Sequence, residues 1–184
     1  MRELVIGDPI DPRTDVGPVI DAEQLRALVR HRDWLATHAR LIHECALPPG
    51  LDGHYFAPVA AEIDAIGDLA HENFGPILHV IRYDKRNLET VIDAINATGY
   101  GLTMGLHTRL DGRIEHVTQR ARVGNLYVNR NIIGAVVGSQ PFGGEGLSGT
   151  GPKAGGPNYL LRFCAERTVT INTAAAGGNV ELLA

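Results

Sequence analysis

Cysteines and aromatic residues are scarce in this sequence, and it has no long hydrophobic run. Its 184 residues include only two cysteines, Cys45 and Cys164, which form neither a C-x-x-C pair nor any metal-ligand spacing. This argues against a disulfide framework and a metal site, and favours a reducing compartment. No apolar stretch is long enough to cross a membrane, and the first residues lack the pattern of a signal peptide. We therefore expect a cytoplasmic protein without a metal.

Positive charge is also limited. Seventeen lysines and arginines stand against 21 acidic residues, which gives a formal net charge of −4. Because no basic block occurs, nucleic acid is not expected to be the main partner. Hydrophobic residues make up 44% of the chain, so we expect a globular fold with a sizeable core.

Glycine, in contrast, is concentrated in residues 138–157, which we call the glycine loop. Such a stretch cannot be a regular helix or central strand, because each glycine loses backbone entropy on ordering. The loop leads into a short helix expected over 158–163, and a helix start favours anions. We therefore expect the amides of Gly155 and Gly156 to hold a carboxylate or phosphate. A merely structural glycine-rich turn is the alternative.

The same loop contains a misleading pattern. Residues 144–149 fit the dinucleotide fingerprint G-x-G-x-x-G, which requires a strand just before it and a helix starting within it. Here Pro141 precedes the pattern, and Gly151 and Pro152 would break the helix. A dinucleotide phosphate loop is therefore not expected at this place.

The rest of the chain alternates helices and strands. Helices are expected over 22–37, 87–98 and 111–122, and strands over 40–45, 55–63, 77–83, 103–108 and 124–128. Pro58 suggests an edge position for its strand, and Asn87 is expected to cap the second helix. Two strand–helix–strand units predict an α/β fold with an open, mainly parallel twisted sheet and helices on both faces.

The sequence ends with a different kind of strand pattern. Residues 167–173 alternate strictly, with Val169 and Ile171 on one face. This predicts a C-terminal edge strand, exposed or lent to another subunit. We therefore divide the chain into residues 1–166 and a terminal strand and tail, 167–184, for oligomerisation or interdomain contact.

The order of four motifs resembles the aldehyde dehydrogenase superfamily. They are Val16-Gly17-Pro18-Val19-Ile20, Glu72-Asn73-Phe74-Gly75-Pro76, Gly124-Asn125-Leu126-Tyr127-Val128-Asn129 and Gln140-Pro141-Phe142-Gly143-Gly144. Residues 149–163 look like the branch that oxidises L-glutamate γ-semialdehyde, the Δ1-pyrroline-5-carboxylate dehydrogenases. Residues 166–179 are similar to that domain in the bifunctional proline utilisation flavoenzymes.

The resemblance implies binding roles residue by residue. Glu72 matches the glutamate that hydrogen-bonds the nicotinamide ribose, and Phe74 matches the aromatic beside the nicotinamide ring. Gly155 and Gly156 match the N–H groups that hold the substrate α-carboxylate, and Phe163 matches an aromatic that lines the aliphatic part of the substrate. The simpler readings are a solvated loop glutamate and two core aromatics.

The resemblance also implies that parts are missing. The family's nucleophilic cysteine, its general-base glutamate and its N-terminal cofactor domain have no match here, so no catalytic residue is assigned. Residues 1–166 would then be the second half of a catalytic domain. The implied cofactor is NAD, with FAD in another domain only if the parent is bifunctional. The implied partners are the missing N-terminal part, the semialdehyde and a second copy bound through the terminal strand. Lys153 and Arg162 receive no ligand role, because surface charge is the commoner state.

Two other functions stay open at this point. The chain could be a non-catalytic oligomerisation or carboxylate-binding module. It could also be a complete small enzyme that uses Cys45 or Cys164 with a histidine. His43 lies two residues before Cys45, and on a strand the two would share a face.

Overall fold

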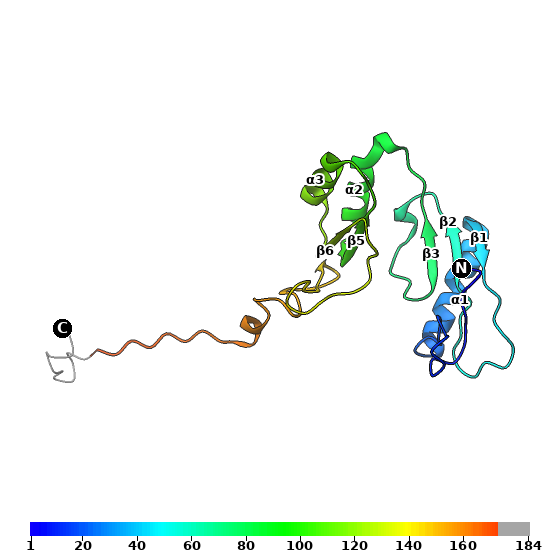
Figure 1. Cartoon of the computed structure of the whole chain (residues 1–184), viewed down its shortest axis with the longest axis horizontal. Coiled ribbons are helices and arrows are strands. Elements are labelled where there is room, and N and C mark those ends of the chain that lie inside the picture. Colours follow the sequence, from blue (N-terminus) through cyan, green and yellow to red (C-terminus); the bar gives the residue numbers. More distant parts are fainter. Residues whose placement is uncertain (173–184) are drawn as a thin grey trace. The chain divides into compact units, whose positions relative to one another are not determined.

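The computed structural model of the chain describes residues 1–172, which fold into two compact units of helices and strands (Figure 1). The first unit comprises Met1–Tyr100 and Asp111–Ala121, and the second comprises Gly101–Leu110 and the residues from Arg122 onward. The α/β class predicted from the sequence is confirmed. No helix within residues 1–172 is both long and apolar enough to span a membrane.

The first unit contains a three-stranded sheet. Its strands are β1 (Arg40–Glu44), β2 (Val59–Glu62) and β3 (Ile77–Val80), in the order β1-β2-β3. β1 pairs with β2 antiparallel, and β2 pairs with β3 parallel. The edge position predicted from Pro58 is wrong, because β2 is the central strand. Pro58 lies just before the first paired residue, where its carbonyl accepts a hydrogen bond from the Cys45 N–H at 2.9 Å and its missing N–H costs nothing.

Helix α1 (Ala22–His38) covers this sheet and confirms the helix predicted over 22–37. The Asp21 side chain caps it by accepting a hydrogen bond from the Gln24 N–H at 2.8 Å. Leu28 and Leu35, seven residues apart on one face, are fully buried. Leu28 packs with Phe56 and Val59 of the sheet side, and Leu35 packs with a second group around Ala61. These two clusters form the core between α1 and the sheet.

The first unit has four further helical segments. The 3-10 turn η1 (Ile66–Asp68) lies between β2 and β3, and the 3-10 turn η2 (Lys85–Asn87) and the helices α2 (Leu88–Ala97) and α3 (Asp111–Arg120) follow β3. Asn87 makes no side-chain capping hydrogen bond, contrary to prediction. The chain turns earlier instead, because Asp84 accepts a hydrogen bond from the Arg86 N–H at 2.9 Å and starts η2. Arg120 of α3 pairs with Asp93 and Glu89 of α2, at 2.8 and 3.4 Å.

The second unit has two short sheets. They join β5 (Thr103–Leu106) to β6 (Asn125–Val128) in parallel, and β4 (Tyr100–Gly101) to β7 (Glu145–Gly146). Parallel pairing was predicted and occurs twice, in β2–β3 and β5–β6. Within the described residues, however, the strands form three small sheets instead of one, since β3 and β5 do not pair.

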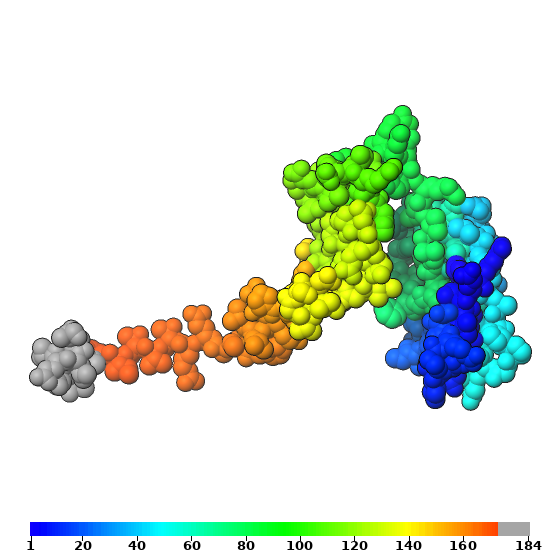
Figure 2. All heavy atoms as spheres, in the orientation of Figure 1, coloured from blue at the N-terminus to red at the C-terminus, as the bar shows by residue number. Residues whose placement is uncertain are grey.

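The C-terminal part differs most from prediction. The helix expected over 158–163 is only the 3-10 turn η3 (Leu160–Phe163). Residues 164–172 have no regular secondary structure, and Val169 and Ile171 are 69% and 77% exposed (Figure 2). Over residues 167–172, the described part of the predicted edge strand, no strand therefore forms, because an alternating segment becomes a strand only when a neighbouring strand accepts its hydrogen bonds. Thr173 and the tail to residue 184 lie outside the described residues.

A histidine pair joins α1 to β3 in the first unit. The Nε2 atoms of His31 and His79 lie 2.8 Å apart, so one ring donates a proton that the other accepts. Burial lowers the pKa of both side chains, and the neighbouring charges of His79 and His71 lower that of His31 further. The contact therefore requires at least one neutral imidazole.

This pair predicts a pH dependence of stability. In the unfolded chain both histidines take up protons near their ordinary pKa of about 6.5, whereas the folded chain resists protonation to lower pH. The unfolded state thus binds more protons below about pH 6.5, and the free energy of unfolding should fall as the pH is lowered through that value. Urea unfolding of the 184-residue chain between pH 7.5 and 5 measures this.

Two variants separate the pair from general acid effects. His79→Gln should flatten the fall in stability, because the remaining His31 no longer faces a second titrating ring. His54→Gln changes an exposed side chain outside the helices and strands and should leave the profile as in the unmodified chain. Identical profiles for the two variants would exclude the pair as the cause.

Candidate functional site

The predicted site residues fall in both units. Glu72 and Phe74 belong to the first unit, whereas Gly155, Gly156 and Phe163 belong to the second. Within residues 1–172, no cluster of three or more His, Cys, Asp or Glu side chains could hold a metal ion.

The loop before β3 presents Glu72 and Phe74 outward. Gln24 of α1 donates its side-chain N–H to the Phe74 carbonyl, which fixes the loop by its backbone. Gly75 follows, and a Cβ there would lie 2.6 Å from Leu28, so the loop lies directly on the core. The Phe74 side chain is consequently 75% exposed, and Glu72 is exposed without a partner among the described residues.

This geometry argues against a core position for Phe74 and leaves both side chains exposed to solvent. Phe74 is not a core residue of this chain. An unpartnered carboxylate can accept hydrogen bonds from two vicinal hydroxyls, and an exposed aromatic face can pack against a flat ring. Both side chains are therefore open to a ligand that offers vicinal hydroxyls or a flat ring.

The glycine loop of the second unit is built onto the start of β6. Asn125, the first residue of β6, is only 9% exposed, and its side chain uses both ends. Its Nδ2 donates to the Pro141 carbonyl at 3.0 Å, and its Oδ1 accepts from the Gly143 N–H at 3.3 Å. These two bonds fix the segment around Phe142 to the strand.

Phe142 connects these anchored residues to the segment that contains Gly155 and Gly156. It exchanges two backbone hydrogen bonds with Ala154, at 3.0 and 2.8 Å. Lys153 donates its Nζ to the Gly124 carbonyl and is half-buried. Lys153 is therefore a hydrogen-bonded residue of the loop and not a fully exposed cation.

The two candidate glycines differ in their hydrogen bonding. Gly155 has a φ of +71°, which favours glycine, and its carbonyl accepts from the Gly138 N–H at 3.0 Å. Within residues 1–172 the N–H of Gly155 has no acceptor. The N–H of Gly156 donates to the Lys153 carbonyl at 3.1 Å. The loop therefore offers one unpaired amide and one that already closes a turn.

The helix expected over 158–163, whose start was predicted to favour an anion, is much shorter than predicted. η3 contains four residues and begins at Leu160, so it supplies no appreciable helix dipole at Gly155. Any preference of this loop for an anion must come from the unpaired amide and from Lys153.

Phe163 lies at the end of η3 on an exposed apolar surface. Its ring packs edge-to-face on Tyr159 with centroids 5.4 Å apart, and its side chain is 72% exposed. Leu160 and Leu161 beside it are 73% and 66% exposed. Phe163 is thus not a core residue of this chain and remains available to contact a ligand or another segment.

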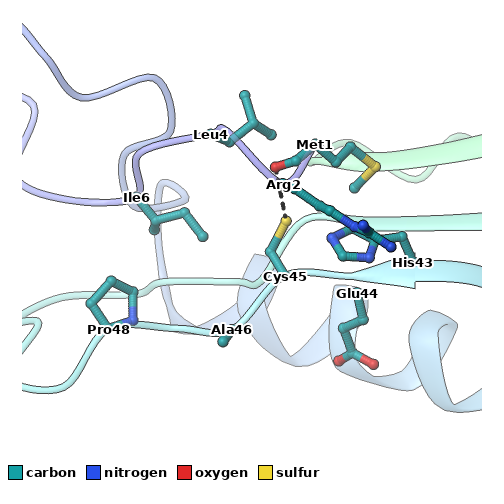
Figure 3. A pocket seen from close by; sticks show the side chains of 9 residues that line it. All are labelled: Met1, Arg2, Leu4, Ile6, His43, Glu44, Cys45, Ala46 and Pro48. Carbon is teal, nitrogen blue, oxygen red and sulfur yellow. Dashed lines mark hydrogen bonds between the residues drawn. The ribbon is translucent and has the colours of Figure 1, made fainter.

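Each of the two cysteine thiols donates a hydrogen bond to a backbone carbonyl. Cys45 and His43 line a depression of about 410 Å³ together with Met1, and the Cys45 thiol donates to the Met1 carbonyl at 3.6 Å (Figure 3). Cys164 is exposed, and its thiol donates to the Leu160 carbonyl at 3.5 Å. Neither thiol forms a hydrogen bond with a histidine in the part of the chain that the structure describes.

Sequence reasoning missed Asn125 as an anchor of the glycine loop. A signal was present, because asparagine is depleted in strands and a buried amide needs partners for both ends. The spacing of sixteen residues between Asn125 and Pro141 gave no indication of which partners those would be.

Comparison with known proteins assigns the chain to a family. Residues 1–169 match the aldehyde dehydrogenase family. The bifunctional protein PutA of Escherichia coli (strain K12) is 50% identical over 173 residues, which are 91% of this chain and 13% of that protein. The 1-pyrroline-5-carboxylate dehydrogenase of Bacillus subtilis is 35% identical over 92% of this chain and 33% of that protein.

Solved structures agree with these matches. A crystal structure of a mutant proline utilization A (PutA) from Bradyrhizobium japonicum has a TM-score of 0.86 and 59% identity, covering 95% of this chain and 18% of that one. The structure of a mutant 1-pyrroline-5-carboxylate dehydrogenase from Thermus thermophilus has a TM-score of 0.77 and 37% identity, covering 87% and 31%. The chain thus spans at most about a third of these relatives, and it belongs to the aldehyde dehydrogenase family.

Proposed function

We propose that this chain is the C-terminal segment of an NAD-dependent L-glutamate γ-semialdehyde dehydrogenase, the enzyme that completes the conversion of proline to glutamate. Its similarity to 1-pyrroline-5-carboxylate dehydrogenases over about nine-tenths of its length supports this. The observation that carries the proposal is Gly155, whose N–H lies unpaired in a glycine-rich loop beside Lys153.

In this function the segment positions reactants and does not react with them. Glu72 would accept hydrogen bonds from the ribose hydroxyls of NAD, and Phe74 would pack against its nicotinamide ring. The cofactor, when bound, supplies a hydride acceptor. The unpaired Gly155 amide would hold the α-carboxylate, joined by the Gly156 amide once that N–H leaves the Lys153 carbonyl, and Phe163 would line the aliphatic part of the semialdehyde. Fixing both molecules lowers the entropic part of the barrier.

The nucleophile would come from the remainder of the enzyme. In the covalent mechanism of this family, a thiolate attacks the aldehyde to form a thiohemiacetal, loss of a hydride to the hydride acceptor converts that adduct to a thioester, and a water molecule hydrolyses the thioester. A flavin would be present only in a bifunctional parent and in a different domain. The high identity to PutA proteins favours such a parent.

The same proposal covers the assembly of the fold. The small sheets of this chain would be parts of one open, mainly parallel sheet with helices on both faces, completed by upstream strands. Residues 1–166 would belong to that catalytic domain, and residues 167–184 would serve oligomerisation or interdomain contact. The exposure of Val169 and Ile171 supports this, because an apolar face needs a cover. The two free cysteines support a cytoplasmic location.

Gly156→Val in the full-length enzyme tests the substrate assignment. A Cβ at Gly156 would lie 3.1 Å from the Lys153 carbonyl and 3.2 Å from Pro141, so the larger side chain should displace the loop. Loss of one charge-assisted hydrogen bond, worth about 1.5–3 kcal/mol, should lower kcat/KM for the semialdehyde roughly tenfold to a hundredfold. An uncharged aldehyde of similar length should be affected less, because it has no carboxylate to bind. Equal losses for both substrates would mean that the loop is only structural.

A further inference from the structure

The side chains of Asn125 and Lys153 each connect the start of β6 to the glycine loop. Asn125 bonds to Pro141 and Gly143, which flank Phe142, and Phe142 is paired with Ala154. Lys153 precedes Ala154 and is bonded through its Nζ to Gly124, the residue before Asn125. The start of β6 is therefore connected to the residue just before Gly155 by two separate routes.

The start of β6 is itself well fixed within the second unit. The Gly124 N–H donates to the Gly101 carbonyl at 2.9 Å, and the Asn125 N–H donates to the Leu102 carbonyl at 3.1 Å. Strand β6 then pairs with β5 along its whole length. Hydrogen bonds to this fixed part of β6 hold the glycine loop in a defined position, which a glycine-rich segment would not keep by itself.

We propose that Asn125 and Lys153 are positioning residues that hold the Gly155 amide in the orientation that binds the substrate carboxylate. This inference rests on the proposed function. Asn125 is buried and both polar ends of its side chain are occupied by the loop, so it acts through the loop and not by contact with the substrate. A displacement of about 1 Å at such a position is enough to impair a positioned reaction strongly.

The test compares variants of the full-length enzyme with two aldehydes. Asn125→Asp keeps the shape of the side chain but replaces the Nδ2 donor with an oxygen that faces the Pro141 carbonyl. Lys153→Met keeps most of the aliphatic stem and removes the Nζ. For both variants, KM for the semialdehyde should rise roughly tenfold, as loss of a hydrogen bond of about 1–1.5 kcal/mol implies. KM for an uncharged aldehyde and for NAD should change less than about twofold, because neither uses the loop amide.

Tyr127→Phe is the matched control. Tyr127 lies on the same strand, is 6% exposed, and donates its hydroxyl to the Gly134 carbonyl at 2.9 Å. Its loss removes a buried hydrogen bond from β6 without touching the anchors of Ala154. Tyr127→Phe should lower the midpoint of thermal unfolding about as much as Asn125→Asp does. It should leave the enzyme's preference for the semialdehyde over the uncharged aldehyde unchanged. A change of preference as large as that of Asn125→Asp would overturn the proposal.

Two further measurements separate possible failures. In a double-mutant cycle, Asn125→Asp should add little to the effect of Gly156→Val, since both act on one loop; fully additive effects would overturn the positioning role. Lys153→Arg should restore most of the semialdehyde KM, because arginine can still donate to Gly124. If Gly156→Val is selective for the semialdehyde and Asn125→Asp is not, the positioning role fails alone. If Gly156→Val itself shows no selectivity, the proposed function fails.

Discussion

Replacing Gly124 with alanine is expected to prevent the second unit from folding. A Cβ at this position would lie 1.8 Å from the Gly143 carbonyl oxygen and 2.9 Å from the Gly144 Cα. Both are backbone atoms, so no side-chain rotation can relieve the overlap. The loop would have to move away from β6, and the bonds from Asn125 and Lys153 would be lost together. A loss above about 4 kcal/mol is expected for such a change, which is comparable to the whole stability of many domains.

Gly112→Ala provides the control for this prediction. Gly112 lies in the first turn of α3, and a Cβ there has no heavy atom within 4 Å. Alanine is favoured over glycine in helices by roughly 0.8–1 kcal/mol, so this variant should be slightly more stable. Urea unfolding followed by circular dichroism compares the two, and amide hydrogen exchange locates the loss in residues 101–110 and beyond 122. A Gly124→Ala variant with unchanged exchange in these segments would show that the close approach is not present in solution.

Local signals in the sequence predicted the first unit well. The Asp21 cap and the spacing of Leu28 and Leu35 specify α1 with little help from the rest of the chain. The edge position predicted from Pro58 was wrong, because the sequence does not distinguish a proline in an edge strand from a proline just before a central strand. Only the pairing of β2 on both sides distinguishes the two positions, and pairing is a property of the tertiary structure.

The second unit depended on contacts that no local pattern reveals. The segment 158–163 has helix-forming residues but too few neighbours to extend beyond η3. Val169 and Ile171 alternate as in a strand, yet nothing in the described chain pairs with them. In the candidate site, Gly155 was predicted from its glycine-rich context and by resemblance, and its site role stays a prediction. The roles of Asn125 and Lys153 were not predicted, because their partners are 16 to 29 residues away.

The isolated 184-residue chain is expected to show no turnover of L-glutamate γ-semialdehyde with NAD. The chemistry requires a thiolate beside a proton acceptor and within reach of the bound aldehyde. The Cys45 thiol donates to the Met1 carbonyl, and the Cys164 thiol donates to the Leu160 carbonyl. Within residues 1–172, neither thiol is hydrogen-bonded to a side chain that could accept its proton. The roles proposed for Glu72, Phe74 and Gly155 are to bind and orient, and orientation without a nucleophile forms no covalent intermediate.

The measurement is the formation of NADH at 340 nm, with the full-length enzyme as the positive control at equal molar concentration. The expected trace for the isolated chain is indistinguishable from buffer. Turnover that disappears in Cys45→Ala or Cys164→Ala would contradict this result and would identify a complete small enzyme. His43→Gln would then decide whether His43, which shares the depression with Cys45, acts as the base. Turnover that survives both cysteine variants would point to a trace of another dehydrogenase in the preparation, because no other side chain here offers the sulfur that the thioester requires.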